Sequence, residues 1–97
     1  MVVIRMDFEW DEAKSEQNLR QRGFGFDYAA CLFEGPVLET IDSRCDYGEI
    51  RIQAIGQVGE DILFVTYTDR NGESRRIISA RKANRKERLL WQSFVNP

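Results

Sequence analysis

The chain has 97 residues, of which 14 are Lys or Arg, 16 are Asp or Glu and none is His. This length suits one domain, residues 1–97, and the 42% apolar and 31% charged residues are typical of a soluble globular chain. The missing His excludes a Ser-His-Asp triad, a Cys-His pair and a Cys/His zinc site within the chain.

The N-terminal part predicts a strand followed by a helix. β-branched and aromatic residues favour a strand over Val2–Trp10. Asp11 is a suitable N-cap for a helix that runs to about Gln21, and Gly23 is suited to end it in the left-handed conformation. The apolar stripe of this helix is thin and consists of Ala13 and Leu19.

A second helix is predicted over Tyr28–Glu34. Asp27 could cap it, and Gly35-Pro36 ends it because Pro cannot continue a helix. Its expected buried residues are Ala30, Cys31 and Phe33.

The rest of the chain predicts four strands and a last helix. The extended segments are 37–41, 49–58, 62–69 and 74–81, and Asn71-Gly72 is a hairpin signal between the last two. Asn84 and Glu87 form a capping-box pattern that opens the helix. The order β-α-α-β-β-β-β-α predicts an α+β fold, a small antiparallel sheet with helices on one face.

Cysteine usage and the chain start bear on the compartment. Cys31 is expected to be a small core residue and Cys45 lies in a polar loop, so a reduced cytoplasmic protein is the simplest interpretation. The apolar stretch at the start of the chain is too short for a signal peptide, and acidic residues follow it too soon. No apolar run approaches the roughly 20 residues of a membrane span, so no membrane partner is expected.

The net charge of −2 conceals a split along the chain. Residues 1–50 carry five basic and eleven acidic side chains, whereas residues 51–97 carry nine basic and five acidic ones. The basic residues could bind a phosphate backbone, or they could form a solvated helix end and a rim that pairs with the acidic half.

Strand alternation suggests where such a basic surface would lie. If Ile50, Ile52 and Ala54 face the helices, Arg51 and Gln53 face away from them. Arg76 and Arg81 are five residues apart, so a regular strand cannot show both on one side. Either a bulge intervenes or Arg81 lies past the end of the strand.

Acidic and phenolic side chains offer further candidates. Asp7, Glu9, Asp11 and Glu12 could bind a metal or transfer protons, but helix capping and strand flanking explain them more simply. Glu49 beside Arg51 is a candidate base, and Tyr67 could transfer a proton or simply pack.

Several motifs resemble the BrnT family of toxins. They are Phe8-Glu9-Trp10-Asp11-Glu12-Ala13-Lys14, Gly23-Phe24-Gly25-Phe26, Gly48-Glu49-Ile50-Arg51 and Arg76-Ile77-Ile78-Ser79-Ala80-Arg81. The resemblance implies the toxin of a type II toxin–antitoxin pair, with a RelE-like fold and an RNA-cleaving activity that stops translation. It also implies a BrnA-like ribbon-helix-helix antitoxin as partner, through which the toxin meets DNA only indirectly.

The chain departs from this family at one place. The family usually has Lys-His-Gly where this chain has Gln21-Arg22-Gly23. Arg22 can hold a phosphate, but it is a poor acid or base because it stays protonated.

These observations predict a metal-independent endoribonuclease without a cofactor, in which an RNA 2′-hydroxyl attacks the neighbouring phosphate. The expected catalytic residues are Arg51, Arg76, Arg81, Arg22, Glu49 and Tyr67, and the expected RNA-binding residues are Lys14, Lys82, Arg85 and Lys86. The alternative is a toxin-like binding module that acts through its antitoxin and transcriptional autoregulation.

Overall fold

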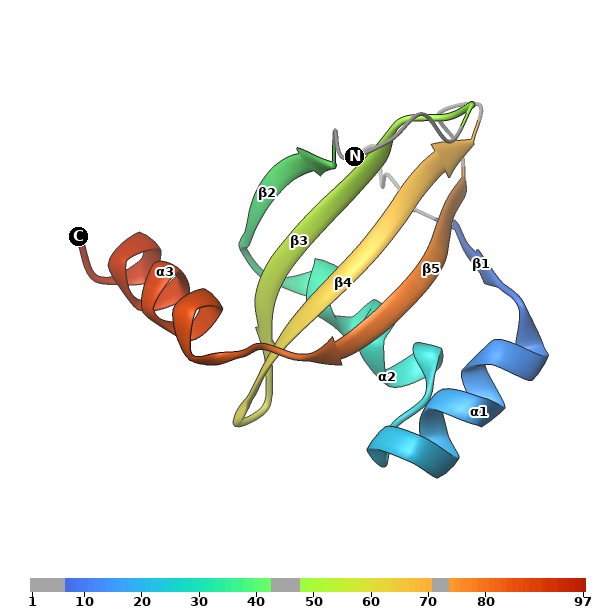
Figure 1. The fold of residues 1–97 in the computed structure, drawn as a ribbon. Helices are drawn as coiled ribbons and strands as arrows, with labels where there is room; N and C mark the ends of the chain where they lie inside the picture. Colours follow the sequence, from blue (N-terminus) through green and yellow to red (C-terminus); the bar gives the residue numbers. More distant parts are fainter. Residues whose placement is uncertain (1–6, 43–47, 71–73) are drawn as a thin grey trace, which may run out of the picture.

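A five-stranded sheet forms the centre of the molecule (Figure 1). The computed structural model describes residues 7–42, 48–70 and 74–97. The strand order is β1-β5-β4-β3-β2. The strands are β1 (Asp7–Trp10), β2 (Val37–Asp42), β3 (Arg51–Val58), β4 (Asp61–Arg70) and β5 (Ser74–Lys82).

The expected antiparallel sheet is in fact mixed. Strands β2 to β5 pair antiparallel, as expected, but β1 pairs parallel to β5. Hairpin signals are local, and the partner of β1 lies near the other end of the chain, so no hairpin reports its direction. The predicted turn Asn71-Gly72 and the strand residues 2–6 lie outside the described residues.

Helix α1 (Glu12–Arg22) begins and ends as predicted. The carboxylate of Asp11 accepts hydrogen bonds from the backbone N–H groups of Ala13 and Lys14, at 2.9 and 3.2 Å. Gly23 has a φ of 88° and donates its N–H to the carbonyl of Leu19.

The buried face of α1 differs from the predicted apolar stripe. Ala13 and Leu19 are exposed, and the buried residues are Ser15 and Asn18. Ser15 Oγ accepts a hydrogen bond from the Phe26 N–H at 2.8 Å, and Asn18 Nδ2 donates to the Phe24 carbonyl at 2.9 Å. Because hydrogen bonds hold α1 to the next segment, a count of apolar residues could not find its inner face.

The second predicted helix is two shorter pieces, α2 (Phe26–Ala30) and the 3-10 helix η1 (Cys31–Glu34). Its N-cap is Gly25 rather than Asp27. Cys31 is exposed, so its expected core position is wrong, and Leu32 is fully buried instead. The tighter 3-10 turn brings residues three apart into line, so Leu32 follows Ala29 onto the sheet.

The core lies between one face of the sheet and the segment of α1, α2 and η1. Its buried residues are Phe24, Phe26, Ala29, Leu32, Ala54, Leu63, Val65, Tyr67, Ile77 and Ala80. Strand β3 passes close to η1 at Gly56, where an added Cβ would lie 2.7 Å from the Leu32 side chain. We call the opposite face of the sheet the open face.

Helix α3 (Arg85–Val95) packs on the open face, so the prediction that all helices cover one face is wrong (Figure 1). The predicted capping box is present, with Asn84 and Glu87 bonded to each other's backbone. Trp91 is 3% exposed and donates its indole N–H to Gln57 at 3.4 Å. None of the helices in the described part of the chain is long and apolar enough to pass through a bilayer.

Candidate functional site

A β-bulge in β5 places two of the predicted arginines on the same face. Ser79 pairs with Thr66, but the next residue of β4, Tyr67, pairs with Ile77, so Ile78 is the extra residue. Arg76 and Arg81 pair with Thr68 and Phe64, which are four residues apart on β4. Both arginines therefore belong to the open face, and of the two alternatives the bulge is the correct one.

Arg51 and Arg76 lie on either side of β4, and each has a carboxylate nearby. Arg51 Nε lies 3.5 Å from a Glu49 carboxylate oxygen. An Arg76 guanidinium nitrogen lies 4.0 Å from Glu9, which also pairs with Arg70 at 3.2 Å. The 4.0 Å separation is long enough for a phosphate to compete with Glu9 for the guanidinium of Arg76.

Arg81 is committed to Glu87. Its two terminal nitrogens each donate to a Glu87 carboxylate oxygen at 2.8 Å, and its guanidinium carbon lies 4.2 Å from the centre of the Phe64 ring. The bidentate bond raises the pKa of Arg81 and lowers the pKa of Glu87. The pair fastens the start of α3 to the end of β5 and neutralises the charge of Arg81.

The structure does not bring Tyr67 together with these arginines. Tyr67 is 1% exposed on the core face, and its hydroxyl donates to the carboxylate of Glu39. The guanidinium carbon of Arg75 lies 4.1 Å from the centre of its ring. Burial, followed by the Glu39 hydrogen bond, raises the pKa of Tyr67 well above its usual range.

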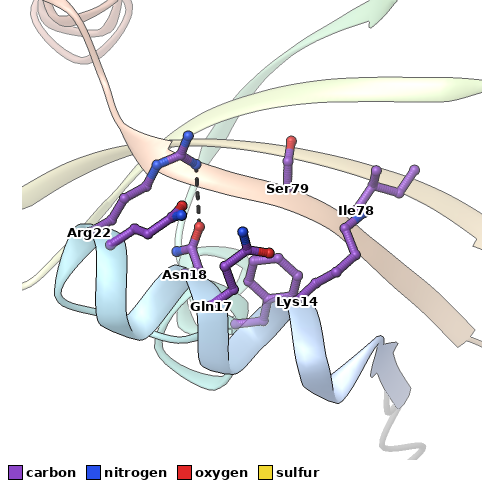
Figure 2. A pocket seen from close by; sticks show the side chains of 8 residues that line it. Lys14, Gln17, Asn18, Arg22, Ile78 and Ser79 are labelled. Carbon is purple, nitrogen blue, oxygen red and sulfur yellow. Dashed lines mark hydrogen bonds between the residues drawn. The ribbon is translucent and has the colours of Figure 1, made fainter.

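Arg22 reaches from the end of α1 to the edge of β5. Its Nη1 donates to the carbonyl of Ala80 at 2.9 Å and to the side chain of Asn18 at 3.3 Å. A pocket of about 180 Å³ lies between α1 and β5 (Figure 2). We call it the α1–β5 pocket; its lining is Lys14, Gln17, Asn18, Gln21, Arg22, Phe26, Ile78 and Ser79.

The α1–β5 pocket is positively charged. Its lining contains two cations, Lys14 and Arg22, and no carboxylate. Within residues 7–42, 48–70 and 74–97, neither cation forms an ion pair. Ser79 pairs with Thr66 on the open face and also lines the pocket, so the pocket adjoins the open face.

The remaining predicted RNA-binding residues lie apart from the α1–β5 pocket lining. Lys82 is exposed, 3.7 Å from Asp61. Arg85 and Lys86 are exposed in the first turn of α3. The expected single basic surface is therefore divided between α1, the open face and the start of α3.

The polar lining of the α1–β5 pocket was predicted only in part, because Lys14 and Arg22 were named from the sequence and Gln17, Asn18 and Gln21 were not. Its α1 residues are Lys14, Gln17, Asn18, Gln21 and Arg22. They repeat at intervals of three and four residues, which places them on one face of a helix. A search for a polar stripe, rather than an apolar one, could have found them.

The acidic group near the N-terminus is dispersed. Asp11 caps α1, Glu12 accepts a hydrogen bond from Trp10 at 3.1 Å, and Glu9 faces two arginines. Among the described residues, no three Asp, Glu or Cys side chains gather into a group that could hold a metal ion.

Comparison with known proteins identifies the family to which the chain belongs. The family model described as "Ribonuclease toxin, BrnT, of type II toxin-antitoxin system" matches residues 10–87. The 1.1 Å crystal structure of the Brucella abortus ribonuclease toxin BrnT is similar, with a TM-score of 0.60 and 25% identity over 84% of this chain and 100% of that one. A search of curated proteins finds no match. The chain belongs to the BrnT family of ribonuclease toxins of type II toxin–antitoxin systems.

Proposed function

We propose that this chain is a metal-independent endoribonuclease that inhibits translation and is neutralised by a BrnA-like ribbon-helix-helix antitoxin. The observation that carries the proposal is the α1–β5 pocket, which presents Lys14 and Arg22 with no carboxylate in its lining. Such a pocket favours an anion, and an RNA phosphate is the anion that a ribonuclease must hold.

The reaction that suits this pocket is attack of an RNA 2′-hydroxyl on the adjacent phosphate. A bond forms between the 2′-oxygen and phosphorus, and the bond to the 5′-oxygen breaks, which leaves a 2′,3′-cyclic phosphate and a 5′-hydroxyl. The protein must align the two oxygens and stabilise the added negative charge of the transition state. Arg22 and Lys14 supply the positive charge that stabilises it. Arg22 is preorganised because Ala80 and Asn18 already hold one of its nitrogens.

RNA on either side of the cleaved bond would cross the open face. Ser79 leads from the pocket to this face, where we propose that Arg76 and Arg51 contact the flanking phosphates. Glu49 lies beside Arg51 and outside the pocket lining, so in this proposal the 2′-hydroxyl gives its proton to water and the leaving 5′-oxygen takes a proton from water. We leave Tyr67 out because its hydroxyl faces the core, and we assign Arg81 to the support of α3.

The exposed cations Lys82, Arg85 and Lys86 would add to the attraction of RNA without touching the reacting phosphate. The likeness to RelE and a cytoplasmic location remain predictions.

Cleavage of a short RNA by the purified chain in the presence of EDTA tests the proposal. We expect products that end in a 2′,3′-cyclic phosphate, and Arg22→Ala should slow the reaction by roughly 100-fold. Arg20→Ala is the matched control because Arg20 lies on the same helix but is exposed and outside the pocket lining. Loss of cleavage with EDTA, or equal rates for the two variants, would contradict the proposal.

A second candidate function is binding without catalysis. The observation in its favour is the complete absence of His, which leaves the pocket without a side chain that titrates near neutral pH. Growth of cells that express the chain alone separates the two functions. Growth arrest supports the ribonuclease, whereas normal growth with capture of an antitoxin supports the binding module.

A further inference from the structure

Helix α3 exposes an apolar face beside a groove on the open face. Leu90 and Phe94 are 49% and 44% exposed, although both lie on the side of the helix that carries buried Trp91. The groove between α3 and the sheet has a volume of about 240 Å³. Its apolar lining is Leu38, Ile55, Phe64 and Leu90.

The groove is bordered by positive charge. Lys86 lines it, and the ranges that the structure describes contain no ion pair of Lys86. The acid of the groove, Glu87, is already paired with Arg81. An occupant with apolar side chains and a negative charge would therefore complement the groove.

We propose that this groove binds an acidic segment of the antitoxin through apolar side chains on one face of that segment. An apolar groove beside a helix suits an amphipathic helix, whose side chains three and four residues apart would contact Leu90 and Phe94. The family assignment supplies the class of partner, and the inference rests on the proposed function in that respect alone.

The position of the groove would also explain inhibition. Gln53 and Phe64 line the groove, and they neighbour Thr66 and Arg81 on the same face of the sheet. A segment seated there would lie over part of the open face that we assign to RNA. Binding would therefore exclude RNA without any contact in the α1–β5 pocket.

The family match adds an argument about specificity. It ends at residue 87, so most of α3, including Leu90 and Phe94, lies beyond it. A toxin must be recognised by its own antitoxin, and a surface outside the shared part of the family can carry that distinction.

The test compares two leucines of α3. Leu90 lines the groove, whereas Leu89, one residue earlier on the helix, is 54% exposed and outside the groove lining. The probe is the antitoxin that co-purifies with this chain from its own organism, titrated by calorimetry onto the full chain. We expect Leu90→Glu to weaken binding by about tenfold or more and Leu89→Glu by less than about twofold.

One more variant and a folding measurement show whether a loss of binding comes from the lost contact. Leu90→Ser removes the apolar contact without adding a charge, and thermal melting of all three variants checks their folding. Equal affinities of the two Glu variants, or failure of the wild-type chain to bind the probe, would overturn the proposal. If Leu90→Glu leaves the antitoxin affinity unchanged but lowers RNA cleavage, the groove binds RNA instead. If the affinity is unchanged but the variant dissociates a dimer, the groove binds a second copy of the chain. Cleavage that fails in every variant and in the wild-type chain, with antitoxin binding intact, contradicts the ribonuclease and leaves the docking site standing.

Discussion

The guanidinium of Arg22 donates a hydrogen bond of 2.9 Å to the carbonyl oxygen of Ala80, which lies 58 residues further along the chain. Strand β1 ends opposite Ile77, so within the described residues no strand lies beside the outer edge of β5 beyond that residue. The side chain of Arg22 extends from α1 and occupies this edge. The same contact satisfies a backbone carbonyl and fixes a cation at the mouth of the α1–β5 pocket.

The position of Arg22 in the pocket lining lets us predict the effect of an imidazole there. Arg22→His would introduce a group with a pKa of about 6.5 at the position where the resemblance to the family predicts His. We expect the wild-type cleavage rate to show no break attributable to imidazole between about pH 5.5 and 7.5, and the variant to gain one. Measurement of kcat/KM across this range gives the answer, with Arg20→His as control. A break of the same pKa in the wild-type chain would contradict the absence of an internal titrating group.

Local signals in the sequence predicted the elements well, and contacts distant in the sequence account for the errors. The two caps, Asp11 and the Asn84–Glu87 box, use neighbouring residues, so their patterns were sufficient. The parallel direction of β1 depends on its pairing with β5 near the other end of the chain, and the position of α3 depends on packing against strands from the middle of the chain. No periodicity reports such packing.

The candidate site was predicted in part for a similar reason. Strand alternation limited Arg76 and Arg81 to two arrangements, but the bulge that decides between them depends on the pairing of β4 with β5. Glu87 neutralises the charge of Arg81 by pairing with it, and a list of basic residues could not show this pairing. The core position of Tyr67 was missed, although alternation along β4 places it on the same face as Leu63 and Val65.

The Arg81–Glu87 pair predicts an acid-sensitive contribution to stability. Because the folded state lowers the pKa of Glu87, the pair stabilises the fold above the ordinary carboxyl range and loses this effect as pH falls through the lowered value. We expect Glu87→Gln to cost about 1 kcal/mol at pH 7, partly through the weakened capping box. The difference from wild type should shrink toward pH 3 in thermal melts. Glu60→Gln, at an exposed turn position, is the control and should show no such trend.

Close packing at Gly56 predicts a destabilising glycine substitution. A Cβ there would lie 2.7 Å from Leu32, which is fully buried and cannot swing away. We expect Gly56→Ala to lower the free energy of unfolding by about 1–3 kcal/mol. Gly35→Ala is the control, because no atom lies within 4 Å of its added Cβ. Equal urea midpoints for the two variants would show that β3 and η1 are not packed as described.

The division between the pocket and the open face predicts two kinetic effects of removing an arginine. Arg76 lies beside flanking RNA in our proposal, so Arg76→Ala should raise KM several-fold and change kcat by less than about threefold. Its binding should also show a shallower salt dependence, by roughly one phosphate contact, in titrations from about 50 to 200 mM salt. Arg22→Ala should instead lower kcat, because it removes the positive charge of the guanidinium beside the reacting phosphate. A fall in kcat of equal size for both variants would place Arg76 at the reacting phosphate and move the reaction onto the open face.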